Sequence, residues 1–183
     1  MLYYDTVTLK DGRTAILRNG TSEDGEADLA IFLRTHEQTD YLASYPDECT
    51  RTAEETGEYL KKQTESPDGI EILAFVDGKI AGAAGIEAHD HSSKIRHRAD
   101  FGISVDRDFW GLGLGNALTD ACIACARKAG FKQLELAVVS DNEKALNLYK
   151  KKGFVEYGRN PRAFLSRYTG YQELIYMYKV LEE

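Results

Sequence analysis

Cysteine is scarce in this sequence, and the few cysteines argue against a disulfide framework. The 183 residues contain three cysteines, an odd number. Two of them, Cys122 and Cys125, lie in a segment with a helical apolar pattern. Because both fall on its apolar face, we expect core packing rather than thioredoxin-like redox chemistry. Free thiols of this kind are typical of a reducing, cytoplasmic compartment.

Long apolar runs are also missing. No stretch reaches the roughly 18 apolar residues that a membrane-spanning helix needs, and residues 1–5 do not begin a secretory signal. Repeats and low-complexity tracts are absent as well. Since 43% of the residues are apolar, the composition predicts one domain over residues 1–183 with a substantial core.

Positive charge is in deficit, which argues against nucleic acid as the main partner. The formal net charge is −7, and Gly20 to Leu60 hold eleven Asp and Glu against two Arg. That segment has a balance of −9, so the other residues carry −7 minus −9, or +2. The acidic segment is either solvated helix surface or a negative mouth that attracts a cationic substrate.

Apolar periodicity and turn residues predict a mixture of hairpins and helices. Asp-Gly pairs at 11–12 and 77–78 indicate tight turns between strands, and Thr52 to Glu55 form a capping box. The order predicts an α+β (mixed α/β) domain with a mixed sheet and helices on both faces. The expected strands are 6–9, 14–17, 70–76, 79–88, 98–105, 133–139, 154–164 and 171–181, and the expected helices are 21–38, 53–64, 116–128 and 142–152.

A glycine-rich turn follows the strand that ends at Val105. Gly111, Gly113 and Gly115 alternate there, and a helix begins at once. Glycine lets the backbone approach a ligand, and a helix N-terminus offers unpaired N–H groups and a positive dipole end. This combination predicts a pyrophosphate site, although a tight strand–helix connection would also need glycine. Asn116 replaces the last glycine of a dinucleotide fingerprint, and the Gly-Lys-Ser/Thr of a P-loop is absent.

Two motifs in this region resemble the GNAT superfamily of N-acetyltransferases. Trp110 to Gly115 matches the coenzyme A signature Gln/Arg-x-x-Gly-x-Gly/Ala, except that Trp110 replaces Gln/Arg. Asn142 to Phe154 matches N-x-x-A-x-x-L-Y-x-K-x-G-F at every specified position. The resemblance covers roughly residues 98–155, and before them only the order of elements agrees.

The resemblance implies a mostly antiparallel sheet of about seven strands, in which a splayed strand pair holds coenzyme A. Pantetheine would pair with the free backbone of Ile103, Ser104 and Val105. Asn142 would contact the coenzyme or cap its helix, and whether the Trp110 side chain makes a contact stays open. The implied cofactor-binding residues are Ile103, Ser104, Val105, Trp110, Gly111, Leu112, Gly113, Leu114, Gly115, Asn116, Asn142 and Tyr149.

Two residues are the candidate catalytic groups. Tyr149 is the position that the resembled family uses as general acid to the departing thiolate, unless it only packs on the sheet. The acceptor amine must lose a proton before attack, and Asp100 is the candidate base, with Glu71 and Glu87 as rivals. His89 and His91 lack a third ligand at suitable spacing, so we expect no metal.

These features together predict an acetyl-CoA-dependent N-acetyltransferase that acts by direct transfer in a ternary complex. The acceptor is expected to be a small cationic amine. The alternatives are a protein N-terminal or lysine acetyltransferase and a coenzyme A-binding sensor without chemistry. We expect acetyl-CoA and the amine as partners, no nucleic acid and no membrane, and leave a homodimer open.

Overall fold

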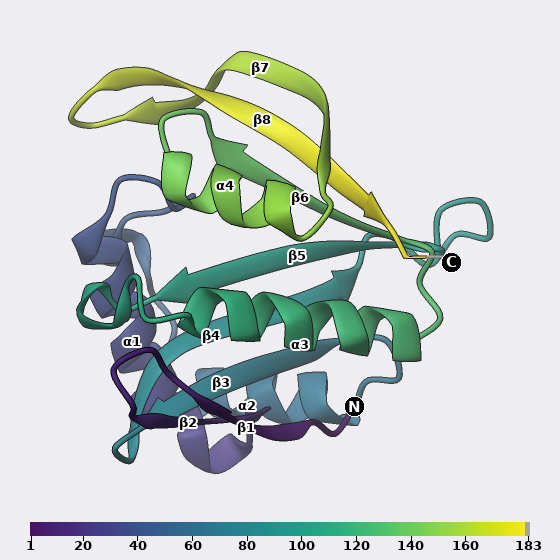
Figure 1. Cartoon of the computed structure of the whole chain (residues 1–183). Coiled ribbons are helices and arrows are strands. Elements are labelled where there is room, and N and C mark those ends of the chain that lie inside the picture. Colours follow the sequence, from purple (N-terminus) through teal and green to yellow (C-terminus); the bar gives the residue numbers. More distant parts are fainter. Residues whose placement is uncertain (182–183) are drawn as a thin grey trace.

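A computed structural model describes residues 1–181 and contains one eight-stranded sheet in the order β1-β2-β3-β4-β5-β6-β8-β7 (Figure 1). All neighbouring strands are antiparallel except β5 and β6. The strands are β1 (Tyr4–Thr8), β2 (Thr14–Asn19), β3 (Ile70–Val76), β4 (Lys79–Ala88), β5 (Arg98–Val105), β6 (Gln133–Val139), β7 (Val155–Ser166) and β8 (Gly170–Val180). The α-helices are α1 (Gly25–Gln38), α2 (Ala53–Glu65), α3 (Leu114–Lys128) and α4 (Glu143–Lys151).

Local sequence signals account for most element boundaries. The predicted capping box at α2 is present, with Thr52 Oγ1 accepting from Glu55 N at 3.2 Å. Asp77 and Gly78 both have positive φ, 50° and 76°, as a tight turn between right-twisted strands requires. Two predictions need correction: α3 begins at Leu114 rather than Asn116, and a 3₁₀ turn at Ser22–Asp24 precedes α1. The sheet has eight strands rather than about seven.

Helices cover both faces of the sheet, as predicted. α3 and α4 lie on one face and α1 and α2 on the other (Figure 1). The larger core lies under α3 and includes Leu118, Cys122 and Cys125, so both predicted core thiols are buried and free. A smaller core of Ile31, Leu60, Leu73, Ile80 and Ala83 lies under α1 and α2. Among residues 1–181, no helix has the length and apolar character needed to cross a membrane.

The parallel pair β5–β6 opens soon after it forms. Its ladder contains only three residue pairs and ends at Asp100 and Glu135. Beyond that point β5 stays paired with β4 as far as Val105, and β6 stays paired with β8 as far as Val139. The predicted splay is therefore present, and it leaves one edge of β5 without a strand partner.

Candidate active site

The glycine-rich turn presents free backbone N–H groups at the head of α3. Gly111 and Gly113 have φ of 78° and 96°, which only glycine adopts without strain. Within residues 1–181, the N–H groups of Gly111, Leu112 and Gly113 have no hydrogen-bond partner. The first turn of α3, Leu114 to Asn116, adds N–H groups that a helix cannot pair internally. A phosphate group would satisfy these donors.

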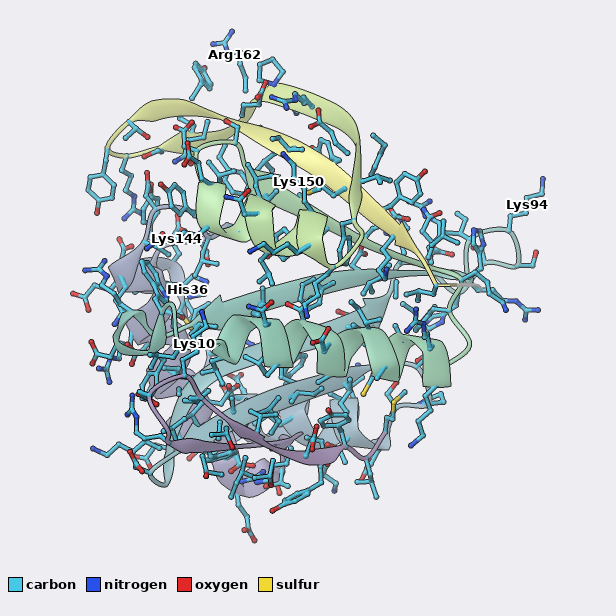
Figure 2. All side chains as sticks on the ribbon, in the orientation of Figure 1. Lys10, His36, Lys94, Lys144, Lys150 and Arg162 are labelled. Atoms are coloured by element: carbon cyan, nitrogen blue, oxygen red, sulfur yellow. The ribbon has the colours of Figure 1, made fainter. Side chains whose placement is uncertain are left out.

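Basic side chains lie beside this turn. The backbone N–H of Lys10 donates to Leu112 O at 3.0 Å, and Lys144 Nζ lies 5.1 Å from the centre of the Trp110 ring. Figure 2 shows Lys10 and Lys144 at the end of the molecule where α3 begins, whereas Lys94 lies at the opposite end. The positive charge thus adds to the helix dipole at the same place.

A buried aspartate attaches the turn to α1. Asp106 is 1% exposed, and its carboxylate accepts from Gln38 Nε2 at 3.0 Å and pairs with Arg34 Nε at 3.0 Å. The same carboxylate accepts from the N–H of Asp108 at 3.1 Å. The turn is therefore positioned by a helix that belongs to the other face of the sheet.

Trp110 contacts the splayed edge of β5. Its Nε1 donates to Val105 O at 2.7 Å, and the ring also lies near Arg107. Trp110 thus occupies the Val105 carbonyl, and the alternation of the β4–β5 ladder, in which Asp106 N donates to Ala81 O, directs the Ser104 backbone to β4. The groups of the predicted segment Ile103 to Val105 that face the gap without a partner are those of Ile103 and the Val105 N–H. The ring stays 38% exposed, so it borders the gap between β5 and β6.

Asn142 caps α4. Its Oδ1 accepts a hydrogen bond from Ala145 N at 3.2 Å. Of the two predicted roles for Asn142, capping the helix is therefore confirmed. A contact between its Nδ2 group and the coenzyme stays a prediction.

Tyr149 of α4 is buried against β5, on the face of the sheet that α3 and α4 cover. Its ring makes edge contacts with Phe101 and Phe154 at centroid distances of 6.1 and 5.9 Å. Burial raises the pKa of Tyr149 above its ordinary value, which keeps the proton on the phenol at neutral pH. No side chain of residues 1–181 contributes a hydrogen bond to its pKa, and since no fully buried side-chain atom among them lacks a partner, the hydroxyl oxygen reaches accessible space. Packing alone explains the ring, and the hydroxyl is available to a ligand.

A pocket of about 410 Å³ lies on the opposite face of the same strands, under α1 and α2. Its floor contains Gly85, Gly102 and Ser104. The opposite wall is formed by His36 of α1, Leu42 of the following loop and Tyr59 of α2. The carboxylates of Glu71, Glu87 and Asp100 line it. Burial lowers the pKa of His36, whose ring stacks on Phe32 at 3.8 Å, so this imidazole does not neutralise the pocket.

The three candidate bases differ in their surroundings. Asp100 and Glu87 form a direct cross-strand pair and are both exposed, and Asp100 Oδ2 lies 2.9 Å from His89 Nδ1. Glu71 is partly buried, and burial raises its pKa to about 8, with Asp28 adding repulsion. The negative charge of the pocket therefore comes mainly from the strands. The acidic segment 20–60 is partly used in pairing, as in Arg18–Asp24 and Arg167–Asp47, both at 2.7 Å.

Sequence reasoning missed the row formed by Glu71, Gly85 and Gly102. These residues are cross-strand partners on β3, β4 and β5, so all three share the pocket face. A Cβ on Gly85 would lie 2.2 Å from Glu71 Oε2, whereas a Cβ on Gly102 would meet nothing within 4 Å. The close approach at Gly85 is thus made by a carboxylate that lies over it.

We expect Gly85→Ala to destabilise the fold by about 1–3 kcal/mol, because the methyl displaces the Glu71 carboxylate and crowds Ile70 O at 3.0 Å. Gly102→Ala is the matched control and should be neutral to slightly stabilising. Denaturant unfolding of both variants measures the difference. Equal stabilities would contradict the placement of Glu71 over Gly85.

Comparison with known proteins agrees with this arrangement. A model of the acetyltransferase (GNAT) family matches residues 31–154. The chain is 31% identical over 149 residues to a mycothiol acetyltransferase of Geodermatophilus obscurus, which covers 76% of this chain and 43% of that protein. It is also 31% identical over 123 residues to the L-amino acid N-acetyltransferase AaaT of Escherichia coli. This match covers 67% of this chain and 75% of AaaT. The chain spans less than half the length of the mycothiol acetyltransferase.

Solved structures share the fold over nearly the whole chain. A GNAT-family acetyltransferase from Streptococcus pneumoniae superimposes with a TM-score of 0.86 at 32% identity, covering 91% of this chain and 99% of that one. The yncA protein of Salmonella typhimurium, solved with acetyl-CoA, has a TM-score of 0.81 at 18% identity. The superposition covers 92% of this chain and 95% of yncA. The family match includes the splayed strands, the glycine-rich turn and Tyr149, and we conclude that this chain belongs to the acetyltransferase (GNAT) family.

Proposed function

We propose that this chain transfers the acetyl group of acetyl-CoA to the primary amine of a small cationic acceptor, by direct attack in a ternary complex. The observation that carries the proposal is the free edge of β5 beside a turn with free N–H groups. That edge and that turn lie between a buried tyrosine on one face of the sheet and an acidic pocket on the other.

The residues present suit the phosphates and the pantetheine arm of acetyl-CoA. The N–H groups from Gly111 to Asn116 would bind the pyrophosphate, and no atom within 4 Å would meet a Cβ on Gly111 or Gly113, so the approach is open. Pantetheine would pair with the backbone groups that face the gap, those of Ile103 and the N–H of Val105. Trp110 and Asn142 would border the arm from opposite sides of the gap. Acetyl-CoA supplies the activated thioester carbonyl.

The amine acts as nucleophile and the thiolate leaves. Tyr149 donates the proton that the departing sulfur needs, which a phenol with a raised pKa can do at neutral pH. A carboxylate of the pocket accepts the proton of the incoming ammonium, and Asp100 is the one the sequence predicts. Since the pocket and Tyr149 lie on opposite faces of β5, base and acid act on opposite sides of the thioester.

The acceptor is proposed from the charge of the pocket. Glu87 and Asp100 line a cavity whose histidine is held neutral, and Glu71 adds its charge as it ionises near pH 8, so a protonated amine is favoured over an anion. The volume of about 410 Å³ suits a small molecule. The E. coli relative is by its name an L-amino acid N-acetyltransferase, which agrees with a small amine. The buried free thiols Cys122 and Cys125 suit a cytoplasmic enzyme.

The test is thiol release from acetyl-CoA with a panel of amines. We expect kcat/KM for a cationic diamine or amino-acid ester to exceed that for a neutral, size-matched amine, and to fall as salt rises. The reason is that the Debye length shrinks from about 10 Å at 0.1 M to about 3 Å at 1 M. The neutral amine is the control, because its rate should barely respond to salt. Equal salt responses, or preference for the neutral amine, would contradict the cationic acceptor.

A further inference from the structure

We propose that Glu71 of β3 is the catalytic base that takes the proton of the acceptor ammonium, and that the amine lies on the side-chain-free floor made by Gly85 and Gly102. This inference rests on the proposed acetyltransferase function and replaces Asp100 in the role of base. It adds a residue from a strand that does not belong to the splayed pair.

The geometry of the sheet carries Glu71 toward the site of chemistry. Glu71 is the cross-strand partner of Gly85, which in turn is the partner of Gly102. Because Gly85 has no side chain, the Glu71 carboxylate extends over it, with Oε2 2.2 Å from where a Cβ would stand. The carboxylate is thus displaced from β3 toward β5, the strand whose free edge faces the gap.

The next position along the row is open. Gly102 is exposed and nothing lies within 4 Å of where its Cβ would be, although it lines the pocket floor. An amine lying over Gly102 would have the Glu71 carboxylate on one side and the edge of Ile103 and Ser104 on the other. A side chain at either glycine would fill the space that the amine needs.

Charged groups from every neighbouring element act on Glu71. Asp28 of α1 and Glu87 of β4 disfavour its ionised form, whereas Arg51, which precedes α2, and the Tyr59 hydroxyl of α2 favour it. Asp100 of β5 and His36 of α1 line the same pocket. Burial is the largest influence and raises the pKa of Glu71 to about 8. Such a group is about one tenth ionised at pH 7 and half ionised near pH 8, and its ionised form is a stronger base than an ordinary carboxylate.

Asp100 and Glu87 are less suited to the role. Both are exposed. Asp100 Oδ2 lies 2.9 Å from His89 Nδ1, so the Asp100 carboxylate already has a hydrogen-bonding partner. Water solvates the ionised form of an exposed carboxylate well, which makes it a weak base toward an alkylammonium of pKa about 10.4. These two residues are better placed to attract the cation than to deprotonate it.

Protons and electron pairs are conserved in the proposed acetyl transfer. The Glu71 carboxylate accepts one proton from the ammonium, leaving a neutral amine. The nitrogen lone pair forms the C–N bond with the thioester carbonyl carbon, and the C–S bond breaks with its electron pair on sulfur. Glu71 passes its first proton to solvent and then takes the second proton from the acylated nitrogen. Tyr149 gives its proton to the thiolate and regains one from solvent, so that one proton in all is released.

The experiment compares Glu71→Gln with the matched variants Glu87→Gln and Asp100→Asn across pH 6 to 10. For wild type, log kcat/KM should rise with pH and level off near pH 8, where Glu71 becomes ionised. For Glu71→Gln we expect a loss of about 100-fold or more at pH 8. The inflection near pH 8 should disappear and the rate should climb toward the pKa of the free amine. Glu71→Asp should keep the inflection at a lower rate, and both control variants should keep it too.

Folding and cofactor binding are measured in the same variants. The pKa of Glu71 in the folded chain lies above its unfolded value, so ionising it costs stability as pH rises from about 4 to about 8. Glu71→Gln should therefore melt no lower than wild type at pH 8 and keep its stabilisation by acetyl-CoA. Loss of the inflection in Asp100→Asn instead, or its survival in Glu71→Gln, would overturn the assignment. A wild-type chain that acetylates no amine would overturn the proposed function itself.

Discussion

Replacing Gly113 by glutamate is expected to weaken acetyl-CoA binding by at least about 100-fold. Gly113 is the N-cap of α3 and lies between free N–H groups, so the new carboxylate would stand where the pyrophosphate binds. Loss of one hydrogen bond to a charged group costs about 1.5–3 kcal/mol, and like-charge repulsion adds to it. The measurement is titration of the variant with acetyl-CoA by calorimetry or by the shift in melting temperature.

The matched control is Gly113→Ala. Both variants place a side chain at φ 96°, a conformation that costs a non-glycine residue about 1–3 kcal/mol. Only the glutamate adds negative charge, and its Cβ meets no atom within 4 Å, so the fold should tolerate both. A glutamate variant that folds and binds acetyl-CoA as wild type does would contradict the assignment of the turn as the pyrophosphate site.

Replacing Tyr149 by phenylalanine is expected to lower kcat by about 10- to 1,000-fold while leaving acetyl-CoA affinity nearly unchanged. The substitution keeps the ring contacts with Phe101 and Phe154 and removes only the hydroxyl. Because burial alone, with no side-chain hydrogen bond from residues 1–181, shifts the pKa of that hydroxyl, stability should stay within about 0.5 kcal/mol of wild type. Steady-state kinetics with a saturating amine measures kcat.

Tyr171→Phe is the control, since Tyr171 is 55% exposed on β8 and should be neutral. Thiol leaving groups of different pKa sharpen the test. If Tyr149 protonates the sulfur, the loss should shrink with acyl donors whose thiols are more acidic, because these leave without help. Wild-type turnover in Tyr149→Phe would mean that the ring serves only packing.

The two largest effects therefore fall on groups from different elements. In the proposed mechanism Gly113 lies at the part of acetyl-CoA that does not react, so its replacement should appear in affinity. The proposed role of Tyr149 is confined to the breaking of the C–S bond, so its replacement should appear in turnover. A variant that altered both quantities equally would point to damage of the whole site.

Local sequence determined the features that depend on neighbours along the chain. The strands at 70–76, 79–88, 98–105 and 133–139 have the predicted bounds, and Thr52 and Asn142 cap the helices that follow them. The glycine-rich turn was also recognisable, because positive φ and a free helix N-terminus are properties of a short segment. The identity of the cofactor and the family came from motifs of this local kind.

Only the tertiary structure decided which carboxylate faces the amine. The sequence favoured Asp100 as base, with Glu71 and Glu87 as rivals. The row Glu71–Gly85–Gly102 exists because β3, β4 and β5 pair in one register. The β3–β4 pairing shifts by one residue between Ala74 and Phe75, and the pairs beyond the shift include Glu71–Gly85. A slip of one residue along β3 would turn the Glu71 side chain to the other face of the sheet. Register depends on the packing of both sheet faces, and so does the raised pKa of Glu71, which burial causes. Neither property is encoded in any single segment, so the sequence alone left the base open and the fold selects Glu71.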